Sequence, residues 1–213
     1  SQSGLITVGF MNQYGFNLAS QDENIFKSFF DLDVLVRDGI GMKLAFKLFK
    51  MPAGKNLNGT DLIPSIIHKT LELKPDFFIF GTQSPWLEKG ANALTQGKKH
   101  YTVDGFHDLD FYIDFLKQHS QPQGYSVIVL AMGMPKQEIL AQMIKINLKT
   151  NGLVICGGAI IDFQAERFSR APQWIRDLSL EWLYRLLKEP KRLFKRYIIG
   201  IPVFFFQLLK NCR

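Results

Sequence analysis

Four short loops combine glycine with polar or charged residues, a combination that lets a ligand approach the backbone closely. They are RDGIG (37–41), GTQSP (81–85), MGMPKQE (132–138) and GGAIIDF (157–163). Each follows a short apolar run of the kind that forms a buried strand. Because ligands of open α/β sheets bind beyond the carboxyl ends of the strands, these loops are the first candidates for chemistry.

The first loop carries a carboxylate, Asp38, between a strand-like run and a helix-like segment. A carboxylate in this place can act as a general base or accept a hydrogen bond from a ribose hydroxyl. It can equally belong to a plain Asp-Gly turn or cap a helix. Gly39 and Gly41 allow a close ligand, so the sequence leaves both interpretations open.

The third loop places Pro135, Lys136 and Gln137 at the expected start of a helix. Free backbone N–H groups and the helix dipole favour a phosphate there, and Lys136 adds positive charge. The alternative is a helix capped by Glu138 with a solvated lysine. The glycine spacing and GK[ST] triplet of a P-loop are absent from the sequence, as is any GxGxxG pattern.

The second loop offers hydrogen-bonding groups at another helix start. Gly81 frees the backbone, and the side chains of Thr82 and Gln83 can donate or accept. An ordinary turn with Ser84 as helix cap explains the same residues and is favoured for this loop taken alone.

In the fourth loop, Gly158 follows a second glycine and Asp162 could accept a hydrogen bond from a ribose or a base edge. Asp162 could instead be a buried cap or a partner of Arg167 or Arg170. Spacing alone does not decide between these roles.

The sequence does not predict a metal centre. Its four histidines show no ligand spacing with cysteine or carboxylate, and DGFHDLD (104–110) lacks the calcium-loop pattern. Cys156 and Cys212 lie far apart and fit a reducing compartment better than a disulfide scaffold.

Strand-like and helix-like segments alternate along the chain. The predicted strands are Leu5–Phe10, Leu32–Val36, Phe77–Phe80, Val127–Ala131 and Leu153–Cys156. The predicted helices are Asn17–Phe29, Gly41–Phe49, Asp61–Leu73, Pro85–Leu94, Asp110–His119 and Pro135–Ile146, with Asp61 and Ser84 as N-caps and Pro135 in a first helical turn. This alternation predicts an α/β fold with a mostly parallel sheet flanked by helices.

The net positive charge lies at the C-terminal end. The 213 residues include 26 Lys and Arg and 19 Asp and Glu, of which residues 165–213 hold 11 and 4. The preceding 164 residues are therefore neutral. We divide the chain into an α/β domain (1–164) and a basic, amphipathic C-terminal appendage (165–213).

The appendage has the pattern of an amphipathic helix interrupted at Pro190. One face of a helical wheel carries Arg185, Lys188, Lys191, Arg192, Lys195 and Arg196, and the other carries Trp182, Leu183, Leu186, Leu187, Leu193, Phe194 and Tyr197. Such a segment fits an anionic membrane surface. The alternative is a helix docked on the domain with a solvated basic face. The apolar run 197–209 is too short to span a bilayer, and a neutral body without a recognised motif disfavours nucleic acid.

In order and spacing these segments resemble the WecG/TagA/CpsF group of bacterial glycosyltransferases, family 26. The matching pieces are Asn12, RDGIG (37–41), GTDLIP (59–64), the GTQ turn, MGMPKQE (132–138), GGAIIDF (157–163) and RAPQWIRDLSLEWLYRLLKEPKRLFKR (170–196). They cover nearly the whole chain.

The resemblance implies a Rossmann-like fold and inverting, metal-independent transfer of a sugar from a UDP-sugar, with no other cofactor. The acceptor would be an undecaprenyl-diphosphate-linked saccharide used in teichoic acid or cell-surface polysaccharide synthesis. The protein would be cytoplasmic and attached peripherally to the anionic inner face of the bacterial cell membrane. It would have no nucleic-acid partner and could form a homo-oligomer. The alternative is a non-catalytic nucleotide-binding or scaffold protein of a polysaccharide assembly complex.

The resemblance also assigns roles to residues. Asp38 matches the candidate catalytic base, Asn12 and Gln137 match positions near the donor, and Asp162 matches a nucleoside contact. Arg185, Arg192 and Arg196 match basic residues of an appendage that closes over the active site and faces the membrane. With the loops above, the predicted donor or nucleotide contacts are Asn12, Gly81, Thr82, Gln83, Gly133, Pro135, Lys136, Gln137, Glu138, Gly158 and Asp162.

Two positions depart from the family pattern. Phe10 stands where members often have threonine, and Asn56 stands where they often have arginine. Both positions are expected near the sugar or its diphosphate. The resemblance therefore does not fix the donor sugar, and N-acetylmannosamine does not follow from it.

Overall fold

The computed structural model describes residues 4–121 and 124–211, and a six-stranded sheet lies at its centre. The strands are β1 (Gly4–Met11), β2 (Val34–Arg37), β3 (Asp76–Gly81), β4 (His100–Val103), β5 (Tyr125–Ala131) and β6 (Asn151–Cys156). Their order is β2-β1-β6-β5-β3-β4 and every neighbouring pair is parallel. All carboxyl ends therefore meet at one edge, and the predicted Rossmann-like α/β fold is confirmed.

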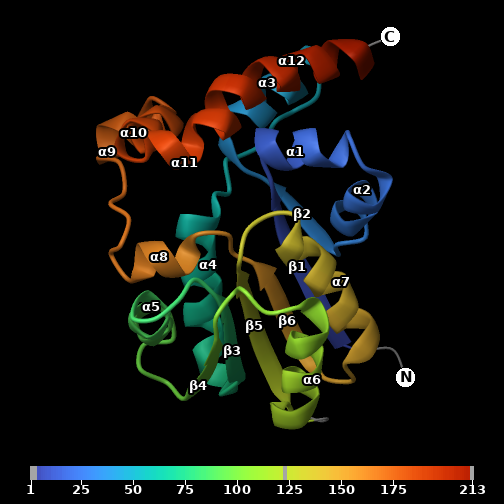
Figure 1. Cartoon of the computed structure of the whole chain (residues 1–213), viewed down its shortest axis with the longest axis vertical. Helices are drawn as coiled ribbons and strands as arrows, with labels where there is room; N and C mark the ends of the chain where they lie inside the picture. Colours follow the sequence, from blue (N-terminus) through green and yellow to red (C-terminus); the bar gives the residue numbers. More distant parts are fainter. Residues whose placement is uncertain (1–3, 122–123, 212–213) are drawn as a thin grey trace.

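Helices cover both faces of the sheet (Figure 1). Those preceding the appendage are α1 (Gln13–Ala19), α2 (Glu23–Phe30), α3 (Gly39–Leu48), α4 (Gly59–Thr70), α5 (Trp86–Leu94), α6 (Leu109–His119), α7 (Lys136–Asn147) and α8 (Ile160–Gln164). The helices α2, α6 and α7 pack on one face, and α4, α5 and α8 pack on the other.

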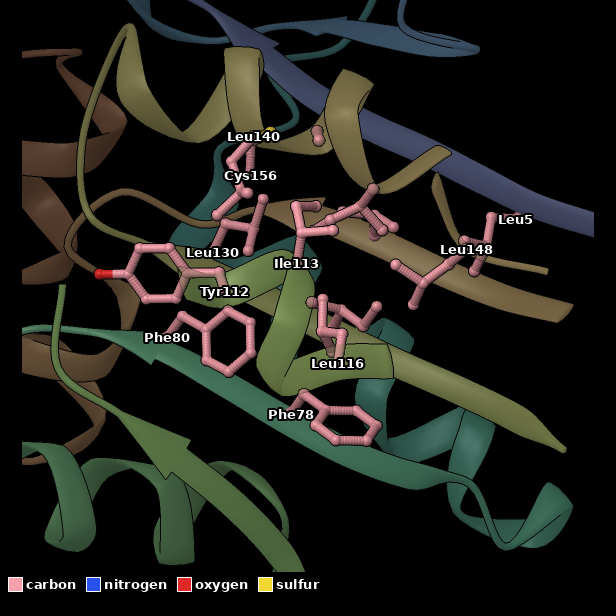
Figure 2. Close-up of a cluster of buried hydrophobic side chains, with 14 of the residues drawn as sticks. Leu5, Phe78, Phe80, Tyr112, Ile113, Leu116, Leu130, Leu140, Leu148 and Cys156 are labelled. Atoms are coloured by element: carbon pink, nitrogen blue, oxygen red, sulfur yellow. The ribbon is translucent and has the colours of Figure 1, made fainter. Parts of the chain in front are cut away.

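The core is a sandwich of two apolar layers, one on each face of the sheet. Figure 2 shows the first layer, in which the side chains of α6 and α7 meet those of the central strands. Phe78, Phe80, Tyr112, Leu116 and Leu130 are fully buried there. Burial of such side chains stabilises the fold by roughly 1.5–3 kcal/mol each, which makes the sheet a rigid support for its loops.

The structure differs from the predicted elements in two regions. The expected helix Asn17–Phe29 is two helices, because the Asp22 carboxylate accepts hydrogen bonds from the N–H groups of Asn24 and Ile25 and starts α2. Strand β4 was not predicted. It is an edge strand in which only Val103 is buried, so it lacks the apolar run of an inner strand.

Three predicted helix starts are wrong. The N-cap of α4 is Asn58, whose side chain accepts from the N–H of Asp61. Ser84 hydrogen-bonds Glu88 instead of capping α5, where Pro85 holds the N-cap position. Pro135 likewise holds the N-cap position of α7 and not a place in its first turn.

The appendage folds into a chain of short helices across the carboxyl edge of the sheet (Figure 1). They are α9 (Gln173–Asp177), α10 (Glu181–Lys188), α11 (Pro190–Phe194), the π-helical turn η2 (Lys195–Ile199) and α12 (Gly200–Asn211). Pro190 opens α11, as the sequence predicts. No helix within the described ranges is both long and apolar enough to cross a membrane.

The appendage has one apolar cluster of its own and one apolar contact with the domain. Leu186, Leu193 and Tyr197 form a small buried cluster of its own. Further along, Phe204 and Leu208 of α12 pack against α3 and α1. Of the apolar face on the helical wheel, Leu186, Leu193 and Tyr197 are buried, whereas Leu183, Leu187 and Phe194 are exposed.

Of the two cysteines, the structure describes the surroundings of Cys156 alone. Cys156, at the end of β6, is buried and free. Burial raises the pKa of its thiol well above the usual value, so it is an inert core residue. Cys212 lies outside the described residues.

Candidate active site

A pocket of about 720 Å³ lies between the carboxyl ends of β1 and β2 and the appendage. The domain contributes Asn12 and Asp38 to its wall, together with the start of α3 and the loop before α4. The appendage contributes Glu181, Arg185 and Arg196. The volume is in the range of small-molecule sites. The structure therefore brings the predicted base and two predicted tail arginines to one cavity.

Asp38 follows β2 directly, and its N–H donates to the carbonyl oxygen of Met11 at 2.8 Å. It occupies the N-cap position of α3, yet its side chain accepts no hydrogen bond from the described backbone of that helix. Asn56 takes over this task, because its Oδ1 accepts from the N–H of Gly39 at 2.8 Å. The Asp38 carboxylate therefore remains available to the pocket.

The surroundings of Asp38 make it more basic than an ordinary carboxylate. Its pKa is raised to about 6, mainly by burial and in part by the nearby Glu181, although Arg196, Arg185 and Arg37 act to lower it. Such a group is mostly ionised at pH 7 and can still accept a proton readily. This is the condition for a general base near neutral pH.

Asn12 lies beside Asp38 at the end of β1 and caps α1. Its Oδ1 accepts from the N–H groups of Tyr14 and Gly15 at 3.0 and 3.1 Å. Within the described part of the chain no acceptor is hydrogen-bonded to its Nδ2 group. The NH₂ group is therefore what Asn12 can offer to a ligand in the pocket.

Arg185 and Arg196 bring unpaired positive charge to the pocket. No carboxylate among residues 4–121 and 124–211 lies within 4.0 Å of either guanidinium. Arg185 lies over the ring of Phe163 at 5.1 Å, and Arg196 lies over that of Tyr14 at 5.0 Å. Burial lowers the pKa of Arg196. Two unpaired guanidinium groups on a cavity wall suit a phosphate or carboxylate ligand.

Arg192 does not join them. It lies outside the pocket wall, pairs with Glu189 at 2.6 Å and stacks over the ring of Phe168 at 4.7 Å. The three arginines that the sequence groups together are thus divided into two that line the cavity and one that does not.

Thr82, Asp162 and Arg167 form a second polar group at the same edge of the sheet. Thr82 Oγ1 donates to Asp162 Oδ1 at 2.9 Å, and Arg167 donates to the same oxygen at 3.0 Å. Of the roles left open for Asp162, pairing with Arg167 is therefore the one observed. Thr82 has a φ of 24°, an unfavourable value for a β-branched residue. Gly81 is buried before it and Gln83 is exposed after it.

Gln137 joins two of the predicted loops. Its Oε1 accepts from the N–H groups of Gly133 at 3.2 Å and Gly158 at 2.9 Å. Its Nε2 donates to Glu138 Oε1 at 2.7 Å, and both side chains are buried. They hold the loops together below the surface. Burial raises the pKa of Glu138 to about 7, and the residue does not cap α7.

Lys136 is engaged by backbone and does not extend freely from its helix. Its Nζ donates to the carbonyl oxygens of Gly105 at 2.9 Å and His107 at 2.5 Å, and it lies over the ring of Tyr112. The ammonium group thus fixes the loop after β4. The expectation that Lys136 supplies charge to a phosphate has no geometric support here.

An ion pair connects the start of the appendage to α4. The guanidinium of Arg170 forms two hydrogen bonds with the carboxylate of Asp61, one of them 3.1 Å long, and Arg176 lies 3.9 Å from the same group. The hydrogen bond from Arg170 holds the pKa of Asp61 below its usual range. Two family motifs, GTDLIP and RAP, meet in this pair.

We expect the Asp61→Asn variant to loosen the appendage. The ion pair is formed at neutral pH and is lost as pH falls through the depressed pKa of Asp61. The variant at pH 7 should therefore hold its appendage as loosely as the wild type does in acid. Limited trypsin digestion should cut the basic segment several-fold faster. The matched control is Glu23→Gln, which removes an exposed ion pair with Lys27 on α2. Equal digestion of wild type and Asp61→Asn would contradict this role.

Fold and site together describe a Rossmann-like protein whose ligand cavity lies at the carboxyl edge of a parallel sheet under a basic helical cover. The family model "Glycosyl transferase WecG/TagA/CpsF family" matches residues 1–213, and the chain belongs to this family. The resemblance stated from the sequence is therefore confirmed.

Two curated relatives carry the same name, N-acetylglucosaminyldiphosphoundecaprenol N-acetyl-beta-D-mannosaminyltransferase. The protein of Bacillus spizizenii is 25% identical over 184 residues, which cover 85% of this chain and 70% of that protein. The protein of Staphylococcus aureus strain MW2 is 24% identical over 180 residues, or 84% and 70% of the two chains.

Proposed function

We propose that the protein transfers a sugar from a UDP-sugar to a hydroxyl group of a polyprenyl-diphosphate-linked saccharide. The observation that carries this proposal is the pocket in which Asp38 lies with the unpaired Arg185 and Arg196. The relatives from Bacillus and Staphylococcus are named for transfer to a diphosphoundecaprenol-linked sugar, which supports the acceptor class.

The proposed reaction is a single inverting displacement. The acceptor hydroxyl gives its proton to the Asp38 carboxylate while its oxygen attacks the anomeric carbon of the donor. The bond from that carbon to the diphosphate oxygen breaks, and UDP leaves with the bonding electrons. Arg185 and Arg196 offset the negative charge that develops on the diphosphate, a role in which fixed cations are most effective when water is excluded. We propose that this chemistry proceeds without a metal ion.

The nucleoside of UDP is assigned to the neighbouring loops. Gly158 and Gly133 have positive φ angles, and an added Cβ at either would meet no described atom within 4 Å. The space beside each Cα is therefore open to a ligand, while the two N–H groups donate to Gln137. Asp162 lies at the same edge and is held by Thr82 and Arg167, so its orientation is fixed before a ribose arrives.

The two departures from the family pattern lie in different places. Phe10 is buried, packs beneath the start of α4 near Gly59, and is not part of the described pocket wall. Asn56 is part of that wall. We therefore leave the donor sugar open and treat Asn56 as the residue that changes the pocket itself.

The experiment that tests this function is turnover with a panel of UDP-sugars and a short-chain prenyl-diphosphate-linked N-acetylglucosamine. We expect one donor to yield UDP and a glycolipid product in equal amounts. The rate of this reaction should be the same with and without EDTA. If UDP binds but no donor turns over, the protein is a non-catalytic nucleotide-binding component, and the proposal fails. A rate that EDTA abolishes would contradict the metal-independent mechanism alone.

Asn56 has a positioning role that variants can separate from simple stability. In Asn56→Ala the N–H of Gly39 loses its acceptor, and the Asp38 carboxylate can turn back to cap α3. We expect kcat to fall about tenfold, the equivalent of about 1.4 kcal/mol. In this variant the new hydrogen bond from the Gly39 N–H to Asp38 favours the ionised carboxylate and lowers its pKa. The acid limb of the pH profile should therefore move to lower pH.

Asn56→Asp should have the opposite effect on pH dependence. The new carboxylate can still accept from Gly39, but its negative charge near Asp38 raises the pKa of Asp38. The acid limb should therefore move to higher pH. Shifts of the same sign in both variants, or none in either, would show that Asn56 does not position Asp38.

A further inference from the structure

A second groove, of about 520 Å³, runs along the outer side of α3 next to the pocket. Lys43, Lys47, Lys50 and Met51 line it. The groove and the Asp38 pocket share Ile40, Lys43 and Leu44 as wall residues, so the two hollows are adjacent on one surface.

The three lysines of the groove carry unopposed charge. Lys43 and Lys47 are one helical turn apart, and Lys50 follows just past the end of α3, so they form a row. All three are exposed. In the part of the chain that the structure describes, none has a carboxylate oxygen within 4.0 Å, whereas Lys145 is paired with Asp33 at 2.5 Å.

Apolar side chains surround this row. Leu44, Leu48 and Met51 are 42%, 46% and 55% exposed. The neighbouring helix α12 packs its Phe204 and Leu208 against Met42 and Ala45 of α3. The two helices are held side by side by a buried contact and lie at the same end of the molecule (Figure 1).

We propose that this lysine groove binds the diphosphate and the first isoprene units of the lipid-linked acceptor. The inference rests on the proposed function. Along such an acceptor a sugar hydroxyl, a diphosphate and an apolar chain follow one another. On the protein surface the Asp38 pocket continues past Ile40, Lys43 and Leu44 into the groove, where the lysines alternate along the chain with the exposed apolar side chains.

The separation of cations supports this assignment over a general attraction to membrane lipid. The reaction brings two diphosphates to one site, the leaving group of the donor and the linker of the acceptor. Arg185 and Arg196 face the interior of the pocket, where the leaving group forms. Lys43 lies at the boundary that the pocket shares with the groove, and Lys47 and Lys50 line the groove alone, so the row can neutralise the second diphosphate.

The test is the triple variant Lys43→Gln, Lys47→Gln, Lys50→Gln, assayed with two detergent-dispersed acceptors. One is a prenyl-diphosphate-linked N-acetylglucosamine, and the other carries the same sugar on an uncharged alkyl chain. With the diphosphate acceptor we expect KM to rise roughly tenfold at low salt and less at high salt, because exposed charges are screened. KM for the UDP-sugar should not change, and the uncharged acceptor should show no difference between variant and wild type.

The matched control is Lys74→Gln, Lys98→Gln, Lys149→Gln, which removes the same charge from residues that precede β3, β4 and β6 at the opposite edge of the sheet. It should behave as wild type.

Three results would overturn the inference. The first is an unchanged KM for the diphosphate acceptor in the groove variant. The second is an equal loss with the uncharged acceptor. The third is loss of binding to phosphatidylglycerol vesicles that contain no acceptor, which would assign the lysines to the bulk membrane surface. If wild type transfers no sugar at all, the proposed function has failed, and the vesicle assay still reports on the groove.

Discussion

Replacement of Asp38 by asparagine is expected to lower kcat about 10²- to 10⁴-fold, the usual contribution of a positioned general base. The amide is nearly isosteric with the carboxylate, so the pocket should keep its shape. UDP affinity, measured by calorimetry, should stay within about twofold of wild type, because the base does not hold the nucleotide. Wild-type turnover in this variant would remove Asp38 from the mechanism.

The pH dependence follows from the same residue. Burial raises the pKa of Asp38 to about 6, so below that pH the carboxyl group is protonated and cannot accept the acceptor proton. The kcat of wild type should therefore rise as pH increases through about 6 and then level off. The residual activity of Asp38→Asn should lack this limb. A limb that persists in the variant would belong to another group.

The second large effect is expected at the two arginines of the pocket. Arg185→Lys or Arg196→Lys keeps a positive charge but loses the planar fork that can bind two phosphate oxygens. We expect kcat to fall about 10²- to 10³-fold, as when a donor to a developing anion is removed. UDP affinity should fall as well, because the diphosphate is present in the bound ground state.

Arg192→Lys is the control for this prediction. Arg192 carries the same guanidinium group and belongs to the same stretch of sequence, but it pairs with Glu189 and lies outside the pocket wall. Its replacement should change kcat by no more than a few-fold. If Arg192→Lys is impaired as severely as the pocket variants, the geometric division of the three arginines is wrong.

The placement of the loops could be predicted because parallel strands share one carboxyl edge. Alternation of apolar runs and helices indicates the parallel sheet. Asp38 and Asp162 can then be assigned to the same edge of the sheet even when the order of the strands is unknown. Strand β4 could not be predicted because an edge strand needs little apolar surface and its sequence has no continuous apolar run. The inner strands β3 and β5 are buried along most of their length, so their continuous apolar runs predict them directly.

The orientation of the appendage could not be predicted from a helical wheel. A wheel assumes one axis, but the backbone leaves the helical region at Glu189 and a new helix starts at Pro190. Both Arg192 and Arg196 follow this break, yet Arg196 lines the pocket with Arg185 and Arg192 pairs with Glu189, although all three share a face on the wheel.

The residues that support the site act over long sequence distances. Asn56 caps the helix behind Asp38 from 17 residues away. Arg170 reaches Asp61 across 109 residues, and Lys136 reaches Gly105 across 31. Local patterns identify such side chains only as polar and solvated. Their roles depend on which loops the sheet places next to one another.

The central claim is a single displacement at the anomeric carbon with Asp38 as the base. Its most direct test is the anomeric configuration of the glycolipid product, determined by NMR from the UDP-sugar that turns over. Our account predicts one product, in which the new glycosidic bond has the configuration opposite to that of the donor. A product that retains the donor configuration would require a second displacement and would contradict the account.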